Sequence, residues 1–456
     1  MIVAAQNLPD PFLTELTWGL SIASAPTVRP ISQWVEDEIV LPPGGPAEGE
    51  PYRHRRHPVS LPWFRAVESG LWTRFAVTGP SQNGKTLMGY VALVLYHIFE
   101  LKETTIIGLP DMNMANDKWS HDFLPVIQAS RYYDLLPDKG EGSRGGLVKR
   151  EIRFRNGVKL RFMTAHSGDK AVAGYTARVL AVTETDGMDT SSETSREADR
   201  IEQLETRLRA FSRLSRRVYL ECTVSIEQGR IWQEWLHGTQ SRFLRPCPHC
   251  GEYVSPEREH LLGWQDAETE DDAAANASWS CPACQALWSE SERRAGWDKI
   301  LLIHRGQTVT REGVIVGDPP KTQTLGMRWS AIDNPFTSAS DIGAEEWKAS
   351  RAKDRESAEK KMRQFVWCMP YESPDIETTP LDPDDLLERV HSLKRGEVPS
   401  DTIGVVAALD TGKRMLHWEA RAVTEDGSAR IIEYGNHAAD ADRLGVYRAL
   451  IKALNE

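Results

Sequence analysis

The chain has 456 residues, which exceeds one ordinary domain and favours two or three. With 40% hydrophobic and 27% charged residues, its composition is that of a globular protein with a large core. No apolar run reaches the roughly 18 to 20 residues of a membrane helix, and the N-terminus lacks the pattern of a secretory signal, so we expect a cytoplasmic protein that is neither secreted nor bound to a membrane. A net charge of −11 argues against a uniformly basic coat for nucleic acid, but a local basic channel remains compatible with it.

The first half of the chain has the pattern of an α/β protein. A Pro/Gly-rich stretch at 41–51 predicts a linker, and beyond it short apolar runs alternate with helical patterns. Alternation of this kind favours a largely parallel sheet covered by helices on both faces. Buried strands are predicted at 75–77, 104–109, 178–182 and 217–222, a helix at 85–101, and a hairpin at 151–162 that turns at Asn156-Gly157.

A phosphate-binding loop is predicted between the first strand and the helix. Residues 79–86 read Gly-Pro-Ser-Gln-Asn-Gly-Lys-Thr and match G-x-x-x-x-G-K-[ST] at every fixed position. Backbone N–H groups of such a loop surround the phosphates, while Lys85 would reach the β and γ phosphates and Thr86 would bind Mg²⁺. The alternative is a Gly-rich turn without a ligand. The predicted nucleotide-binding residues are Gly79, Ser81, Gln82, Asn83, Gly84, Lys85 and Thr86.

A P-loop enzyme also needs a second buried strand that ends in acidic residues. The apolar run 179–182 leads into Thr183, Glu184, Thr185 and Asp186. Glu184 is placed to activate water, but Thr183 stands where the metal-holding Asp is expected. Mg²⁺ would then depend on Thr86, on water and on Asp186. The alternative is an ordinary buried strand with a structural polar end.

Four of the six cysteines form two C-x-x-C pairs, which predict a structural zinc site. Cys247 and Cys250 form one pair and Cys281 and Cys284 the other, with 30 residues between the pairs. Two such knuckles supply four thiolates to one tetrahedral Zn²⁺. A redox dithiol is the rival interpretation, and His249 is expected to be a bystander. Within this region, residues 266–277 predict an exposed acidic loop.

The last third of the chain contains a predicted amphipathic helix at 344–366 and an acidic, proline-containing linker at 373–399. Strand patterns then return at 405–409, 417–424 and 430–434, followed by a predicted helix at 439–454.

This combination resembles the large terminase subunit of tailed phages, in its lambda-type branch with an inserted zinc ribbon. The resemblance covers most of the chain from about residue 34. The family reads D-E-x-D where this chain has Thr183 to Asp186, and S-T-P where this chain has Cys222-Thr223-Val224. Further matching segments are Glu50-Pro51-Tyr52-Arg53, Pro62-Trp63, Asn156-Gly157, Ala177-Arg178, the knuckle at 247–251 and Asn334-Pro335.

The resemblance implies an ATPase that moves double-stranded DNA into a prohead. Lys85 and Glu184 would be catalytic, the Thr223 loop would couple hydrolysis to DNA movement, and Tyr52 or Trp63 would stack on the adenine. It also implies an RNase H-like nuclease domain that cuts concatemers with a set of divalent metal ions. In that domain Asp410 would be a metal ligand, and its alternative is a turn or capping residue. We expect only the beginning of the nuclease domain in this chain.

The expected organisation has five parts: an N-terminal segment at 1–45 that could contact a small terminase subunit, a P-loop ATPase core at 46–244, a zinc ribbon at 245–290, a helical lid and linker at 291–395, and the incomplete nuclease domain at 396–456. The expected cofactors are ATP, Mg²⁺ and Zn²⁺. The expected partners are double-stranded DNA, the small terminase subunit, the portal of the prohead and further copies of the chain, in the host cytoplasm. Two other functions remain open, namely a helicase-type or remodelling ATPase on nucleic acid and an assembly factor that does not hydrolyse ATP.

Overall fold

The structure, a computed structural model, describes residues 28–45, 47–143, 148, 150–164, 175–188, 200–371, 393–411 and 415–438. The chain divides into two units, Met1–Pro374 and Asp375–Glu456, and each is described by itself. Most of the predicted N-terminal segment and of the predicted linker, and the predicted helix at 439–454, lie outside the described residues. None of the helices in the described ranges has the length and apolar character needed to span a bilayer.

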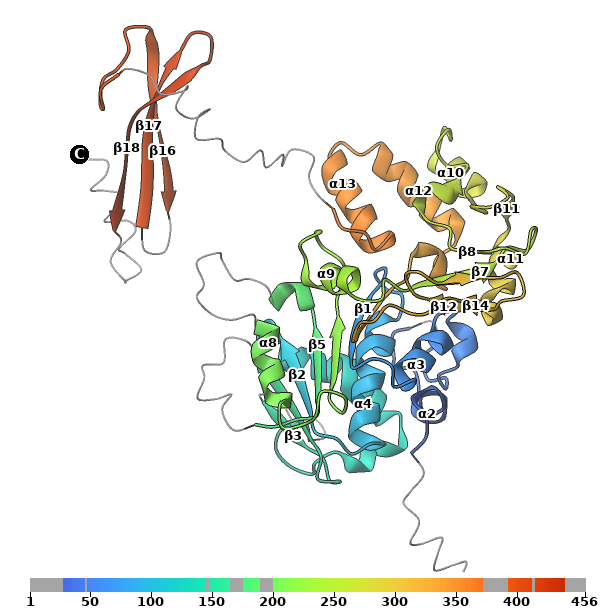
Figure 1. Ribbon diagram of the computed structural model, residues 1–456. Coiled ribbons are helices and arrows are strands. Elements are labelled where there is room, and N and C mark those ends of the chain that lie inside the picture. Colours follow the sequence, from blue (N-terminus) through green and yellow to red (C-terminus); the bar gives the residue numbers. More distant parts are fainter. Residues whose placement is uncertain are drawn as a thin grey trace, which may run out of the picture. The chain divides into compact units, whose positions relative to one another are not determined.

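The first unit is built on a seven-stranded sheet with the order β15-β1-β6-β5-β2-β4-β3 (Figure 1). Neighbouring strands run parallel except β3, which pairs antiparallel with β4 through the predicted Asn156-Gly157 turn. The expected α/β fold with a parallel sheet is therefore confirmed. The strands are β1 (Arg74–Thr78), β2 (Thr105–Leu109), β3 (Glu151–Arg153), β4 (Lys159–Thr164), β5 (Val179–Thr183), β6 (Arg217–Glu221) and β15 (Thr324–Arg328).

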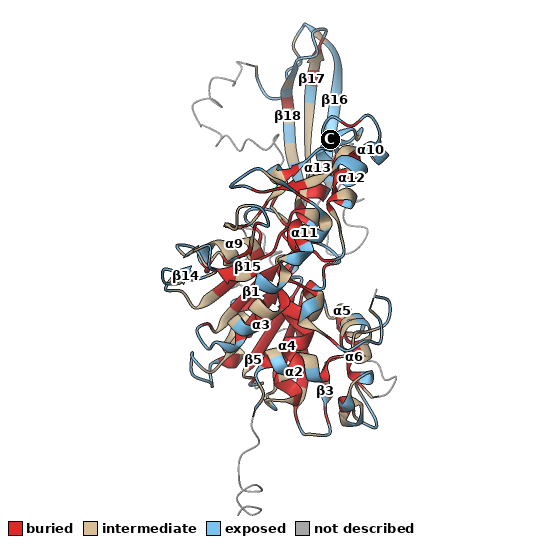
Figure 2. Ribbon diagram, turned by 90° about the vertical axis from the view of Figure 1, so that its right-hand side faces the viewer, coloured by how far each residue is buried: buried red, intermediate tan, exposed pale blue. Residues whose placement is uncertain are grey.

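Each face of this sheet is buried in its own apolar core, which Figure 2 shows as red strands in the middle of the unit. In β5, Val179 and Ala181 belong to one core while Leu180 and Val182 belong to the other, as the two-residue period of a strand requires. Burial on both faces explains the continuous apolar runs in the sequence. The first core includes residues of α2 (Ile31–Glu38), α3 (Ser60–Glu68), α4 (Ala92–Phe99), α5 (Met114–Asp117) and α6 (Leu124–Gln128), and the second includes residues of α8 (Arg200–Glu205) and α9 (Arg230–His237).

Residues 242–316 form small antiparallel sheets around the cysteines. β12-β7-β8 and β11-β10-β9 are three-stranded, and β13-β14 is a hairpin. The segment 266–277, predicted as a loop, contains helix α10, because Thr269 caps it and three acidic residues occupy its first turn. The elements are β7 (Arg242–Pro246), β8 (Tyr253–Val254), β9 (Leu261–Leu262), α10 (Glu270–Asn276), β10 (Ser278–Ser280), β11 (Leu287–Trp288), α11 (Glu290–Ala295), β12 (Leu301–Ile303), β13 (Thr308–Val309) and β14 (Ile315–Val316).

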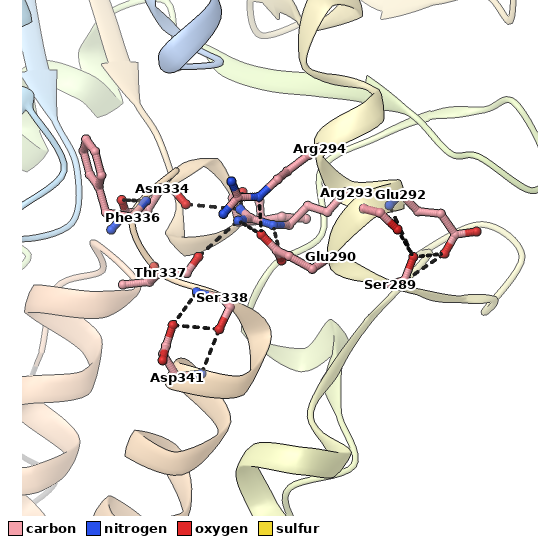
Figure 3. Close-up of polar contacts among 12 residues, drawn as sticks. Ser289, Glu290, Glu292, Arg293, Arg294, Asn334, Phe336, Thr337, Ser338 and Asp341 are labelled. Atoms are coloured by element: carbon pink, nitrogen blue, oxygen red, sulfur yellow. Dashed lines mark hydrogen bonds and ion pairs between the residues drawn. The ribbon is translucent and has the colours of Figure 1, made fainter. Parts of the chain in front are cut away.

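Arg293 of α11 fixes the loop that follows β15 (Figure 3). Its buried guanidinium pairs with Glu290 and donates hydrogen bonds to the carbonyl oxygens of Ile332, Asn334 and Thr337. A buried guanidinium is stable only when its donors are satisfied, so this set of bonds specifies one path for the loop. The loop leads into α12 (Ala339–Ser350), which begins with a reciprocal Ser338–Asp341 cap.

The single helix predicted at 344–366 is wrong. The structure has α12, a break at residues 351–354, then α13 (Arg355–Lys361) and one π-helical turn, Met362–Val366. The break has a local cause: the Asp354 side chain accepts a hydrogen bond from Ser357 N and so begins a new helix.

The second unit contains an antiparallel meander, β16 (Thr402–Thr411), β17 (Met415–Thr424) and β18 (Ala429–Ala438). The three predicted strands are confirmed. Several large apolar side chains of this sheet are exposed to solvent, namely Ile403, Val405, Val406, Leu409, Ile431 and Tyr434.

Candidate nucleotide site and four-cysteine centre

The loop at 79–86, the predicted phosphate loop, lies where the sequence places it, between β1 and the helix that ends with α4. Gln82 and Gly84 adopt left-handed φ values of 54° and 81°, which let the loop turn tightly. A Cβ on Gly79 would come within 2.5 Å of the Trp329 indole, so only glycine fits at this point. The loop directly follows Thr78, the last residue of β1, so it lies at the carboxyl edge of the sheet, where α/β proteins bind ligands.

Two side chains brace the loop. The Asn83 side-chain oxygen accepts a hydrogen bond from Lys85 N at 3.0 Å, and His57 Nε2 lies 2.7 Å from the Asn83 carbonyl oxygen. Burial lowers the pKa of His57 to about 4 against the opposing effect of this hydrogen bond, so at neutral pH the ring is uncharged and donates through Nε2. The buried Asn83 Nδ2 finds no hydrogen-bond partner among the described residues. A buried amide donor beside a phosphate loop is a group that a phosphate could satisfy.

Lys85 is buried and forms an ion pair with Glu221, the last residue of β6. Lys85 Nζ lies 2.9 Å from Glu221 Oε1, and Thr183 Oγ1 donates to Glu221 Oε2 at 2.9 Å. Burial raises the pKa of Glu221, but the Lys85 ammonium and the Thr183 hydroxyl outweigh it and hold the pKa below its ordinary value. Both members of the pair are therefore charged at neutral pH. The sequence reasoning missed Glu221, although an acid that ends a buried strand was the available signal.

The two acids that follow β5, Glu184 and Asp186, have different surroundings. Glu184 has a left-handed φ of 54°, its side chain is half exposed, and Lys118 Nζ lies 3.8 Å from its carboxylate. Asp186 instead accepts hydrogen bonds from the Ser225 hydroxyl and from Ile231 N, at the start of α9. Asp186 is thus bound to the segment after β6, so we do not retain it as a magnesium ligand.

One segment, residues 362–371, contacts both the phosphate loop and the segment that follows β6. Ser81 N donates to the Phe365 carbonyl oxygen at 2.8 Å. Gln364 Nε2 and Tyr371 N both donate to the Ser225 carbonyl oxygen, at 2.5 and 3.2 Å. Ser225 lies two residues beyond Thr223, so the predicted coupling loop and the phosphate loop share one neighbour.

Tyr52 is not where an adenine could stack on it. The side chain is 6% exposed, its ring packs edge-on against Phe64 and His54, and its hydroxyl bonds to Ser60. A ring in this position has no open face, so Tyr52 is a core residue of the unit.

The four cysteines converge on one point. Their sulfur atoms all lie within 4.8 Å of one another, with 3.8 Å between Cys247 and Cys284 and 3.9 Å between Cys250 and Cys281. Tetrahedral zinc with bonds of about 2.3 Å requires sulfur separations of about 3.8 Å. The donor set and its spacing fit a structural zinc ion. His249 pairs with Glu292 at 3.3 Å and is not a member of the group.

Both knuckles have the same local geometry. Each begins a hairpin turn, with Gly251 N donating to the Cys247 carbonyl and Gln285 N to the Cys281 carbonyl. The two donors, Gly251 and Gln285, have left-handed φ values of 75° and 62°. The residues at the second position after the first cysteine, His249 and Ala283, donate backbone N–H to a sulfur atom. Such bonds favour thiolates, the form that binds metal.

Asp410 lies on β16 of the second unit, opposite His417 of β17, and is exposed. Within the described ranges, the four cysteines are the one group of three or more His, Cys, Asp or Glu side chains close enough to share an ion. The described residues therefore bring no set of carboxylates to Asp410.

Comparison with known proteins gives two family matches. Residues 47–306 match the model of the phage terminase large subunit gpA, ATPase domain, and residues 324–456 match the model of the terminase large subunit gpA, endonuclease domain. The second match begins at β15, a strand that the structure places in the ATPase sheet beside β1. None of the curated proteins matches the chain.

Three solved structures are similar to this one. The HK97 bacteriophage large terminase has 14% identity and a TM-score of 0.42, over 93% of this chain and 70% of that chain. A large terminase from a thermophilic bacteriophage, solved in complex with ADP, has 10% identity and a TM-score of 0.30, over 89% and 74%. The ATPase domain of the Thermus phage P74-26 large terminase has 12% identity and a TM-score of 0.27, over 41% and 70%. The family assignment rests on the two family models.

Proposed function

Because this chain belongs to the gpA family of phage terminase large subunits, with an ATPase domain and an endonuclease domain, we propose that it hydrolyses ATP at residues 79–86 to move double-stranded DNA into a prohead. The observation that carries this proposal is the phosphate loop at the carboxyl edge of a parallel sheet, with a buried Lys85 and an acid-ended neighbouring strand. DNA packaging is the activity of the family, and ATP hydrolysis at this site would drive it.

The residues around the loop fit a magnesium nucleotide. The buried Asn83 amide and the charged Lys85 are complementary to phosphate oxygens. Lys85 would contact the β and γ phosphates and Thr86 would offer its hydroxyl to the metal. Bound Mg²⁺ supplies charge neutralisation on the phosphates.

Glu184 is the proposed activator of water. Its left-handed backbone directly after β5 is the kind of conformation that clusters at functional sites, and Lys118 lies close enough to hold its carboxylate. The carboxylate would orient the attacking water and accept its proton.

Residues 362–371 would transmit the structural change caused by ATP binding and hydrolysis to the coupling loop. These residues bond to Ser81 on one side and to Ser225, next to Thr223, on the other. A loop displaced by phosphate binding would therefore move the neighbour that it shares with the coupling loop.

The remaining assignments follow from the family and the cysteine geometry. We propose structural Zn²⁺ at Cys247, Cys250, Cys281 and Cys284, and Asp410 as a nuclease metal ligand. We also propose that the chain works in the host cytoplasm with a small terminase subunit, the portal and further copies of itself.

Parallel measurement of ATP turnover and ATP binding tests the proposal. We expect Glu184→Gln to lower turnover about 10² to 10⁴-fold while ATP still binds, because the variant loses a general base but no phosphate contact. Glu227→Gln, at an exposed glutamate beyond β6, is the matched control and should turn over like wild type. Turnover that is negligible in wild type and in Glu184→Gln alike would indicate a non-hydrolysing assembly factor instead.

A further inference from the structure

We propose that Glu221, at the end of β6, is the carboxylate that holds the hydrated Mg²⁺ of the bound nucleotide, in place of the acid that is missing at Thr183. The proposal rests on the proposed ATP site and assigns the metal-holding residue within it. The expected acid would end β5, whereas Glu221 ends the neighbouring strand.

The sheet places Glu221 between the two strands that define the site. Its Cα is in register with Thr183 of β5 on one side and with Val77 of β1 on the other. Val77 lies two residues before the phosphate loop. A carboxylate at this position is therefore central to the carboxyl edge, beside both the loop and the end of β5.

Thr183 and Glu221 form a matched pair. The Thr183 hydroxyl donates to one carboxylate oxygen of Glu221 while Lys85 binds the other. An Asp at 183 would place a second carboxylate against Glu221, and two adjacent carboxylates disfavour each other's charged form. Threonine at 183 is thus what a charged Glu221 requires, which explains why the usual acid is absent from β5.

Nucleotide binding changes the partners of Glu221. Glu221 is 3% exposed, and a buried carboxylate is stable only while a cation or hydrogen bonds compensate it. When the phosphates engage Lys85, the Lys85–Glu221 ion pair weakens and Glu221 needs another positive partner. A hydrated Mg²⁺ next to Thr86 provides that charge, and its water ligands are donors that a carboxylate accepts.

The nearby acids have other partners. Asp186 is bound by Ser225 and by Ile231 N, and the Asp122 carboxylate lies 3.6 Å from Lys118 Nζ. Glu184 is half exposed and lies on the Lys118 side. Of these four acids, Glu221 is the one that already touches the lysine of the phosphate loop.

Binding of a fluorescent ATP analogue to the full chain, with Mg²⁺ and with EDTA, tests this assignment. We expect wild type to bind more tightly with Mg²⁺ by about tenfold or more, and Glu221→Gln to lose this enhancement while its affinity in EDTA stays equal or rises. Glu184→Gln should keep the enhancement, because its carboxylate is assigned to water. Full Mg²⁺ enhancement in Glu221→Gln would overturn the proposal.

A relocation variant separates a metal role from a structural one. Thr183→Asp combined with Glu221→Gln moves the acid to the end of β5, about one hydrogen-bond length away, and we expect it to regain most of the Mg²⁺ enhancement. Glu221→Asp keeps the negative charge and should keep part of the Mg²⁺ enhancement. If Glu221→Asp loses the enhancement and the relocation variant does not regain it, Glu221 has a role in folding alone. Wild type that binds no ATP analogue in either condition would overturn the proposed nucleotide site itself, and the present assignment with it.

Discussion

The carboxyl edge of the seven-stranded sheet and the three-stranded sheet of the second unit both present an acid at the end of an apolar strand, yet they differ in what surrounds it. Glu221 is buried between two parallel strands and meets Lys85 and Thr183. Asp410 is exposed on an antiparallel meander, with His417 opposite it on the neighbouring strand. Among the described residues, the same sequence pattern therefore gives a buried cluster of charged and polar side chains in one region, and in the other an exposed acid that belongs to no group of three or more metal-binding side chains.

The difference follows from topology. Parallel strands end at the same edge, so the predicted phosphate loop and the residues that follow β5 and β6 converge there. In the meander, successive strand ends point in opposite directions, and neighbouring side chains come only from the directly paired positions. A functional residue at a parallel edge acquires partners from the fold, whereas one on a meander depends on other segments.

The largest effect is expected at Lys85. Lys85→Ala removes the proposed phosphate contact and should lower ATP turnover by at least about 10³-fold. It also leaves the buried Glu221 carboxylate without its cation, which costs about 3–5 kcal/mol of stability. Chemical denaturation and turnover assays measure the two effects. The double variant Lys85→Met with Glu221→Gln should regain the stability but not the turnover. An equal loss of stability in both variants would contradict the interpretation that the two residues form one charged pair.

The next effect is expected at the four cysteines. Cys247→Ser should lower the zinc content from one ion per chain to none and destabilise residues 242–303 by several kcal/mol, since structural zinc contributes directly to folding. Metal analysis and thermal unfolding measure this. Cys368→Ser, at a buried cysteine outside the centre, is the control and should retain its zinc. Less than one zinc per wild-type chain would contradict the assignment.

A smaller effect concerns pH. The pKa of His57 is lowered to about 4 by burial, so the unfolded chain binds a proton below pH 6.5 that the folded chain does not. Stability should therefore be complete above pH 6.5 and decrease as the pH falls toward 4, by at most about 3 kcal/mol. Urea unfolding of wild type and His57→Asn at several pH values checks this, and equal slopes for both between pH 4 and 6.5 would exclude His57 as the cause.

The smallest effect is expected in the second unit. Asp410→Ala should change the free energy of unfolding by no more than about 0.5 kcal/mol, because the side chain is exposed, and should leave ATP turnover unaltered. A loss of ATP turnover in Asp410→Ala would show that Asp410 influences the ATP site, contrary to this prediction.

The sequence was sufficient wherever a local pattern determines the outcome. Residues 79–86, the Asn156-Gly157 turn and the C-x-x-C pairs form the expected structures because spacing and turn chemistry act over a few residues. Strand β15 was missed because Thr324, Gly326 and Arg328 dilute its apolar character. A Cβ on Gly326 would come 2.8 Å from the Trp235 Cα, so glycine is needed at this point of the strand. That contact is long-range and has no local signal.

Two residues of the candidate site depend on long-range contacts of the same kind. Tyr52 fits the resemblance, but it lies in a core whose members come from distant segments. Glu221 ends a strand that the sequence predicts, but its place beside the loop at 79–86 follows from the position of β6 between β1 and β5, which no spacing along the chain encodes. Helix α10 was predicted as a loop because its segment is acidic, but the Thr269 side chain caps the helix and acidic residues favour its first turn.

The dependence of ATP turnover on duplex DNA tests the central claim most directly. We predict that linear double-stranded DNA raises the turnover of the full wild-type chain, that Glu184→Gln shows no such rise, and that Glu227→Gln responds like wild type. Turnover that duplex DNA does not change, or that is equal in wild type and Glu184→Gln, would contradict a DNA-packaging ATPase at residues 79–86.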